Sequence, residues 1–267
     1  GLAAVAGQIQ RVEMRAISIT GSLPFVSASL HFRRARAAPR GSIPVIVAQN
    51  LTKRFGTFTA VEDVCFEVGT GQIVGFIGPN GAGKTPPMRM LTGFIPATAG
   101  SAQVAGFDVF ESTMDVRRSV GYLPESPPLY MDLSVGQYLQ FIAEIRGLEK
   151  TTQTRRIGEV MEAVGLTGFE KRLLGSLSKG YRQRVGLAQA IIHDPSVLIL
   201  DEPTSGLDPK QLVGIRSFIK NLAADRTVIL STHILSEVEA LCDRAIVIDG
   251  GRVVADDTLD GLRDTVG

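Results

Sequence analysis

Apolar runs and amphipathic segments alternate along residues 45–258. Short, nearly uninterrupted apolar runs, typical of buried strands, occupy residues 45–48, 64–68, 73–77, 197–200, 227–231 and 245–248. Helical spacing of apolar residues occurs over 84–91, 134–147, 154–164, 211–223 and 236–242, and a further helix begins at Ser178. The turn at 249–252 leads into 253–255, which predicts a closing hairpin. Continuous apolar strands alternating with helices predict an α/β fold whose mostly parallel sheet is covered on both faces.

One stretch interrupts this alternation. From Ser134, a plausible N-cap, the pattern is helical as far as Gly147, and helices continue to about residue 176. We therefore expect an inserted α-helical subdomain over about residues 126–180.

The N-terminal segment differs from the rest in charge and pattern. Residues 1–45 carry six arginines and one acid, a net charge of +5, whereas the remaining 22 basic and 26 acidic residues sum to −4. Residues 1–44 show no sustained period, and their Arg-rich, acid-poor composition leaves a transit peptide open. We expect a disordered or mis-annotated upstream extension at 1–44, followed by the folded domain at 45–267.

Bulk composition excludes several classes of protein. An apolar content of 44% with 21% charged residues is typical of a globular domain, and a net charge of +1 gives no reason to expect nucleic acid as a partner. No apolar run reaches the roughly 18–20 residues that span a bilayer. Cys65 and Cys242 lie far apart without a CxxC pattern, which favours reduced thiols in the cytoplasm. If the protein works at a membrane, it must dock onto another chain.

The strongest motif is a glycine-rich loop between the strand at 73–77 and the helix at 84–91. It consists of Gly78, Pro79, Asn80, Gly81, Ala82, Gly83, Lys84 and Thr85. This spacing, with a strand before and a helix after it, predicts a phosphate-binding P-loop. Its N–H groups would converge on phosphate at a positive helix N-terminus, Lys84 would reach the β- and γ-phosphates, and the Thr85 hydroxyl would ligate Mg²⁺. The predicted ligand is therefore ATP with Mg²⁺.

Two prolines follow this loop. Pro86 and Pro87 stand where N–H donors are wanted by phosphate oxygens, and losing one charge-assisted donor costs about 1.5–3 kcal/mol. Each proline also disfavours the α region for the residue before it, which predicts strain at Thr85 and Pro86. We expect weakened nucleotide binding, or else an error in the sequence at these two positions.

A second constellation lies at the ends of two further strands. The run at 197–200 ends in Asp201 and Glu202, and His233 follows the strand at 227–231. Because ligands bind at the carboxyl ends of parallel strands, Asp201 is expected to hold Mg²⁺ and Glu202 to polarise the attacking water. His233 is a candidate sensor of the γ-phosphate.

The segment from Leu177 to Arg184 allows two interpretations. Ser178 could simply cap an ordinary helix. Alternatively, its hydroxyl, the Gly180 backbone and the helix dipole form a second anion site. One nucleotide does not need two phosphate sites on one chain, whereas two copies arranged head-to-tail do.

Several motifs together resemble those of ABC-type ATPases over about residues 46–258. Leu177-Ser-Lys-Gly-Tyr-Arg-Gln183 is similar to the ABC signature, with Lys179 and Tyr181 as variations. The run at 201–208 resembles Walker B joined to the D-loop, and 231–233 resembles the H-loop. This resemblance implies a P-loop NTPase fold with an additional antiparallel β subdomain. It also implies a dimer that sandwiches two ATP, with Ser178 and Gly180 of one copy on the γ-phosphate held by the other.

The resemblance adds three residues to the expected nucleotide site. Phe55 would stack on adenine, Asp208 belongs to the D-loop, and Glu125 takes the place of the Q-loop glutamine. Glu125 with the segment 127–130 is similar to exporter-type subunits related to drug-efflux and gliding-motility ATPases. Those relatives often continue beyond the catalytic domain, which leaves open that this sequence is a fragment.

The leading hypothesis is the ATPase subunit of an exporter, located in the cytoplasm at the inner face of the cell membrane. Its partners would be a second copy of itself, or a homologous subunit, and an integral-membrane permease. One alternative is a soluble ABC ATPase acting on ribosomes or DNA, although one cassette with about 90 residues between P-loop and signature argues against it. Another alternative is a hydrolytically impaired regulator, because of the two prolines.

Overall fold

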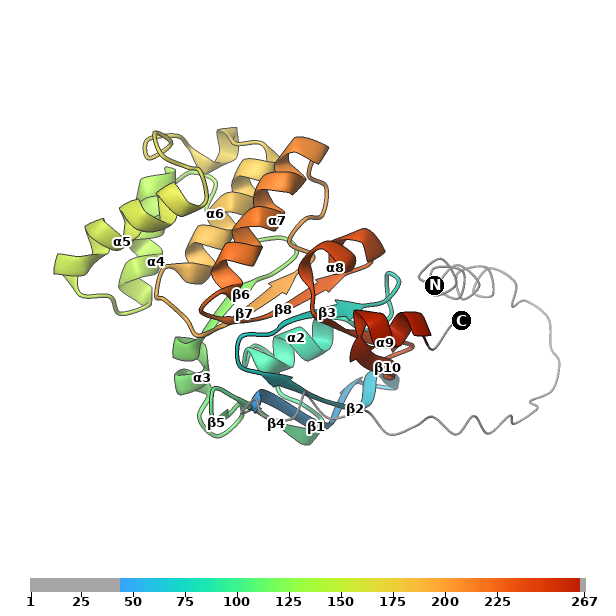
Figure 1. Ribbon diagram of the computed structural model, residues 1–267. Coiled ribbons are helices and arrows are strands. Elements are labelled where there is room, and N and C mark those ends of the chain that lie inside the picture. The colour runs from blue at the N-terminus through green and yellow to red at the C-terminus, as the bar shows by residue number, and fades with distance from the viewer. Residues whose placement is uncertain (1–43, 265–267) are drawn as a thin grey trace, which may run out of the picture.

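The computed structural model describes residues 44–264 of the chain (Figure 1). The prediction of an N-terminal extension at 1–44 falls almost wholly on residues outside the described part.

A six-stranded sheet forms the centre of the molecule, with the order β10-β9-β3-β8-β7-β6. The strands are β3 (Ile73–Ile77), β6 (Val120–Leu123), β7 (Val197–Asp201), β8 (Thr227–Thr232), β9 (Arg244–Asp249) and β10 (Arg252–Thr258). All neighbours from β9 to β6 are parallel, and only β10 pairs antiparallel, with β9. The mostly parallel sheet and the closing hairpin are confirmed.

A second, four-stranded sheet is antiparallel throughout, in the order β2-β1-β4-β5. Its strands are β1 (Pro44–Phe55), β2 (Phe58–Gly69), β4 (Ala99–Val104) and β5 (Phe107–Asp108). The expected antiparallel β subdomain is therefore present. Strands β1 and β2 extend well beyond the apolar runs at 45–48 and 64–68 that predicted them, because their remaining residues pair with each other.

Helices cover both faces of the central sheet. Helix α2 (Thr85–Leu91) lies between the two sheets, and helices α6 (Lys179–Ile191), α7 (Pro209–Ala223) and α8 (Leu235–Leu241) cover the opposite face (Figure 1). The alternation of strand side chains separates two cores: Leu198 and Leu200 belong to the core with α6 and α7, whereas Val197 and Ile199 face α2. This two-sided burial explains why the parallel strands read as continuous apolar runs.

The chain between β6 and β7 is helical. It contains α4 (Val135–Ile145), α5 (Lys150–Ala163), a short 3₁₀ turn at Leu174–Ser176 and then α6. Ser134 caps α4 as predicted, in a capping box where its hydroxyl accepts from Gln137 N and the Gln137 side chain accepts from Ser134 N. Two short helices complete the described part, α3 (Thr113–Ser119) and α9 (Leu259–Asp264). Within residues 44–264 no helix has the length and apolar character needed to cross a bilayer.

The free energy of unfolding is expected to depend on pH through His193, which follows the end of α6. Its Nε2 lies 3.0 Å from the Val120 carbonyl oxygen, which fixes the helix end to β6. Burial, reinforced by the charge of Arg146, lowers the pKa of His193 from 6.5 to about 4. Because the folded state favours the neutral ring, the contribution of His193 to the free energy of unfolding is complete above pH 6.5 and is lost as pH falls toward 4. Urea unfolding is expected to show a loss of about 1–2 kcal/mol from this group between pH 7 and pH 5.

The His193→Gln variant keeps an N–H donor for Val120 but cannot titrate. Its stability is expected to vary less between pH 7 and pH 5 than that of the natural chain. An identical pH dependence in the two proteins would contradict the role of His193.

Candidate functional site

Three neighbouring parallel strands bring the predicted site residues together. β3 runs directly into the P-loop, β7 ends at Asp201 with Glu202 next, and β8 ends at Thr232 with His233 next. In the sheet β8 lies between β3 and β7. The carboxyl ends of all three strands therefore meet at one edge, where ligands of parallel sheets bind.

The backbone of the P-loop is packed too closely for side chains at two positions. A Cβ on Gly78 would lie 2.4 Å from the Ile248 carbonyl oxygen. Gly83 has a φ of +99°, and a Cβ there would lie 2.8 Å from the Ala60 carbonyl oxygen. The two glycines permit the tight path that leads the loop to the N-terminus of α2.

Lys84 is buried beneath this loop. Its Nζ donates hydrogen bonds to the Gly78 oxygen at 2.6 Å and to the Pro79 oxygen at 3.1 Å. The same Nζ lies 3.4 Å from Glu202 Oε1. The lysine therefore joins the loop to the carboxylate that follows β7, and places a positive charge where phosphate would bind.

The prolines after the loop do not displace the helix. α2 begins at Thr85 and includes Pro86 and Pro87, so both residues that precede a proline adopt the α conformation that a following proline disfavours. Proline is tolerated at these positions because N–H groups in a first helical turn have no intrahelical partner, so no helical bond is lost. The loss of two N–H donors at this helix N-terminus remains.

Asp201 and Glu202 are both buried and held by Ser231. The Ser231 hydroxyl donates to Asp201 Oδ1 at 2.5 Å and accepts from Glu202 N at 2.9 Å. Glu202 has a φ of +48°, in the left-handed region that is costly for a residue with a side chain. Such an outlier is typical of functional sites, where the surroundings enforce it.

His233 completes the cluster. Its Nδ1 lies 3.0 Å from Glu202 Oε2, and its side chain is 41% exposed while that of Glu202 is 8% exposed. Glu202 thus has Lys84 beside one oxygen and an imidazole beside the other. The structure brings together Lys84, Asp201, Glu202 and His233 as the sequence predicted.

The signature segment lies at the start of α6. Ser178 occupies the N-cap position, but its side chain makes no capping hydrogen bond. The interpretation of Ser178 as an ordinary helix cap is therefore not supported by the geometry. Gly180 is buried, and the Gln183 side chain donates to the Pro203 oxygen at 3.1 Å, which connects α6 to the turn after Glu202.

Three further predicted residues lie on other segments of the chain. Phe55 is 52% exposed at the end of β1, and Lys53 Nζ lies 5.1 Å from the centre of its ring. The Asp208 side chain caps α7 by accepting from Gln211 N at 2.9 Å. Glu125 lies in the loop after β6. Within residues 44–264, no recorded hydrogen bond joins these three side chains to the P-loop.

Sequence reasoning missed two contributors to the site. Ser231 was noted only as part of a motif, and its bonds to Asp201 and Glu202 depend on the pairing of β7 with β8. Glu237 is completely buried on α8 behind the cluster. An acidic residue in an amphipathic helix usually faces solvent, so the local sequence does not distinguish Glu237 from the exposed Glu239 on the same helix.

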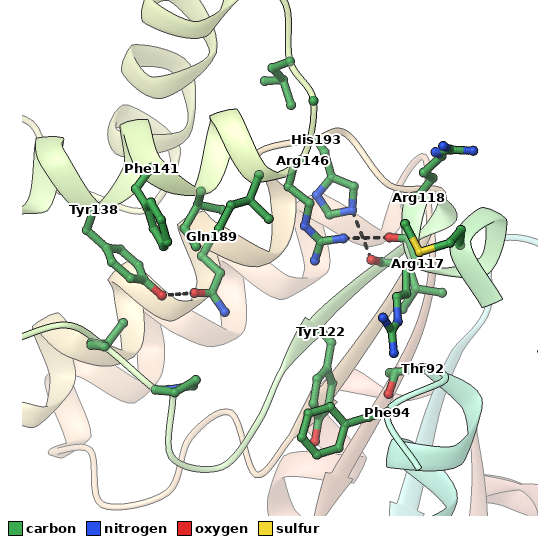
Figure 2. A pocket seen from close by; sticks show the side chains of 18 of the residues that line it. Thr92, Phe94, Arg117, Arg118, Tyr122, Tyr138, Phe141, Arg146, Gln189 and His193 are labelled. Atoms are coloured by element: carbon green, nitrogen blue, oxygen red, sulfur yellow. Dashed lines mark hydrogen bonds between the residues drawn. The ribbon is translucent and has the colours of Figure 1, made fainter. Parts of the chain in front are cut away.

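A separate groove of about 1090 Å³ lies between the P-loop half of the molecule and the helical segment. Figure 2 shows Phe94, Tyr122 and Thr92 on one side and Tyr138, Phe141 and Gln189 on the other. Arg117, Arg118 and Arg146 also line it, and none of the lining residues in the described part of the chain is acidic. The groove is therefore aromatic and positively charged.

Comparisons with known proteins are consistent with this geometry. The family described as ABC transporter matches residues 61–205. The bacitracin transport ATP-binding protein of Bacillus licheniformis is 39% identical over 221 residues, covering 82% of this chain and 71% of that protein. The Nod factor export ATP-binding protein I of Ralstonia nicotianae is 38% identical over 216 residues, covering 80% and 67%. A solved ATP-binding subunit of an ABC transporter superposes with a TM-score of 0.76 at 30% identity, covering 83% of this chain and 92% of the other.

Proposed function

This chain belongs to the family of ABC transporter ATP-binding proteins, and on that premise we propose how its residues bind and hydrolyse ATP. It is the nucleotide-binding ATPase subunit of an exporter-type system. The observation that supports the assignment of roles most directly is the cluster of Lys84, Asp201, Glu202 and His233 at the end of the P-loop strand. These groups are what phosphoryl transfer to water requires: a cation for the phosphates, a metal ligand, a base and a polar sensor.

The P-loop residues 78–85 bind the phosphates through their backbone N–H groups, and Lys84 exchanges its loop carbonyls for the β- and γ-phosphate oxygens. Glu202 takes the proton of the attacking water as general base. His233 orients Glu202 and faces the γ-phosphate. Phe55, exposed at the end of β1, stacks on adenine.

Thr85 and Asp201 would hold Mg²⁺, and their chemistry fits that ion. Mg²⁺ prefers hard oxygen ligands and takes one or two from protein, the others from phosphates and water. Asp201 is buried, and among residues 44–264 its side chain accepts a hydrogen bond from Ser231 alone, which leaves lone pairs for the ion or its water. When bound, Mg²⁺ would neutralise charge that develops on the phosphates.

Dimerisation is general in this family, and we place Ser178, Gly180 and Asp208 at the interface of a head-to-tail dimer around two ATP. Ser178 supports this because its hydroxyl starts α6 without capping it, and so can donate to a phosphate held by the other copy. Glu125 lies in the loop that connects the catalytic half to the helical segment, where it can reach Mg²⁺ or its water.

The domain division follows from these roles. We assign residues 45–267 to one ABC ATPase domain, in which about 126–180 would constitute the helical subdomain. The catalytic groups come from the ends of β3, β7 and β8, whereas the signature comes from the end of this subdomain. Motion of the subdomain would therefore bring Ser178 toward or away from the partner's ATP.

The groove fits a membrane-spanning permease as partner. Phe94 and Ile145 are 66% and 64% exposed, and such large apolar groups on one face mark an interaction site. The neighbouring Arg117, Arg118 and Arg146 favour a partner segment with an apolar face and an acidic residue. This partner would hold the subunit at the inner face of the cell membrane and recognise the exported molecule. Two relatives are named for the transport of bacitracin and the export of Nod factor.

Purification from detergent-solubilised membranes tests this function. The chain is expected to be recovered with a hydrophobic membrane-spanning protein and to hydrolyse ATP only when Mg²⁺ is present. Recovery with ribosomes or DNA in place of such a protein would overturn the assignment to export.

The groove itself is tested by a variant that carries Phe94→Asn and Ile145→Asn. Loss of two large apolar contacts is expected to reduce co-purification by at least tenfold, because each is worth about 1.5–3 kcal/mol when fully buried. ATP binding should not change. The control is Leu173→Asn, which removes an apolar side chain of the helical segment that is 52% exposed and lies outside the groove. Equal recovery of both variants would contradict docking in the groove.

A further inference from the structure

Glu237 is a completely buried acidic residue that the roles above leave unused. It lies in α8, on the face that packs against the central sheet. Its Oε2 accepts two hydrogen bonds, from Thr204 Oγ1 at 2.6 Å and from Thr232 Oγ1 at 2.9 Å. The nearest cation is Arg216, whose Nη2 lies 4.0 Å from Oε1. A carboxyl group is costly to bury, so a position that keeps one calls for an explanation.

The two threonines belong to the two catalytic turns. Thr204 lies two residues after Glu202, and Thr232 is the residue immediately before His233. Thr232 Oγ1 also accepts from Ile234 N at 3.0 Å, which leaves its proton for Glu237. One carboxylate oxygen therefore joins the turn after β7 to the end of β8.

The turn after β7 is also held from the other side. Gln183, in the signature helix α6, donates to the Pro203 oxygen at 3.1 Å, next to Thr204. Glu202 keeps its left-handed backbone, φ +48°, between these attachments. A costly conformation of this kind persists only where its surroundings enforce it.

We propose that Glu237 is a positioning residue for ATP hydrolysis, which fixes Glu202 and His233 relative to each other through Thr204 and Thr232. The inference rests on the proposed function, because it concerns the rate at which Glu202 activates water. Without the shared acceptor, the two turns are free to shift and the 3.0 Å contact between Glu202 and His233 is lost. A misplacement of about 1 Å is enough to lower a rate about 100-fold.

The test compares Glu237→Ala, Glu237→Gln and the natural chain in MgATP hydrolysis and ATP binding. For Glu237→Ala we expect kcat to fall about 10- to 100-fold while the Kd for ATP stays within about threefold, because the P-loop is not part of this network. Glu237→Gln keeps an oxygen that can accept from both threonines, and is expected to recover most of the rate. The matched control is Glu239→Ala, an exposed glutamate two residues along the same helix, which should behave as the natural chain.

Two further variants keep the test decisive if Glu237→Ala does not fold. Thr204→Val and Thr232→Val each remove one donor, and each is expected to lower kcat severalfold without changing the Kd for ATP. Combining either with Glu237→Gln should give a rate close to that of the threonine variant alone, because glutamine keeps the acceptor oxygen.

Three results would overturn the positioning role. They are a kcat for folded Glu237→Ala within twofold of the natural chain, wild-type rates in both threonine variants, or a parallel loss of ATP affinity and rate that glutamine does not rescue. A natural chain that hydrolyses no ATP would instead overturn the proposed function, so the two failures are distinguishable.

Discussion

Replacing Glu202 with glutamine is expected to lower kcat for ATP hydrolysis by about 10²- to 10⁴-fold, the range that a general base contributes. The amide cannot take the proton of the attacking water, although it has nearly the same shape and can keep the contact with His233. The Kd for MgATP should stay the same or decrease, because a negative charge 3.4 Å from Lys84 no longer competes with the phosphates. Phosphate release at saturating MgATP measures the first effect, and an equilibrium titration with ATP measures the second.

The control for this variant is Glu239→Gln, the same chemical change at an exposed site on α8. It should leave both constants unchanged. A Glu202→Gln protein that turns over at more than one tenth of the natural rate would remove Glu202 from the role of base.

Replacing Pro86 and Pro87 with threonine is expected to give the second-largest effect, in the direction of tighter binding. Both prolines lie in the first turn of α2, where each substitution adds an N–H group directed toward the phosphates. One charge-assisted donor is worth about 1.5–3 kcal/mol, which corresponds to roughly a 10- to 150-fold lower Kd for ATP. Titration of the double variant with ATP and with ADP measures this change.

Pro209→Thr is the matched control, because Pro209 also begins a helix but lies outside the P-loop. Its ATP affinity should equal that of the natural chain. Unchanged affinity in the Pro86→Thr, Pro87→Thr protein would show that the missing donors do not limit binding. A natural chain that binds ATP but hydrolyses it only after this replacement would favour the hydrolytically impaired regulator.

The sequence predicted the central sheet well because its strands are buried on both faces. Such strands read as continuous apolar runs, and the motifs at their carboxyl ends gather at one edge whatever the details of packing. Strands β4 and β6 were not predicted, because neither reads as a continuous apolar run of the length that marks a buried strand. β4 has the sequence Ala-Gly-Ser-Ala-Gln-Val, which lacks an apolar run, and it is a strand because β1 pairs with it.

The catalytic residues were predictable from motifs, whereas the groups that hold them were not. Ser231 contacts Asp201 across 30 positions of sequence, and Glu237 contacts Thr204 across 33. No local pattern encodes such a contact, because it depends on which strands become neighbours.

The most direct test of the proposed mechanism is the molar mass of the Glu202→Gln protein by light scattering, with and without MgATP, together with the amount of nucleotide bound. The sandwich predicts a monomer without nucleotide and, with MgATP, a dimer that holds two ATP and is abolished by replacing Ser178 with arginine. A protein that binds ATP at saturation and remains monomeric, or a dimer that forms equally well without nucleotide, would contradict the shared site.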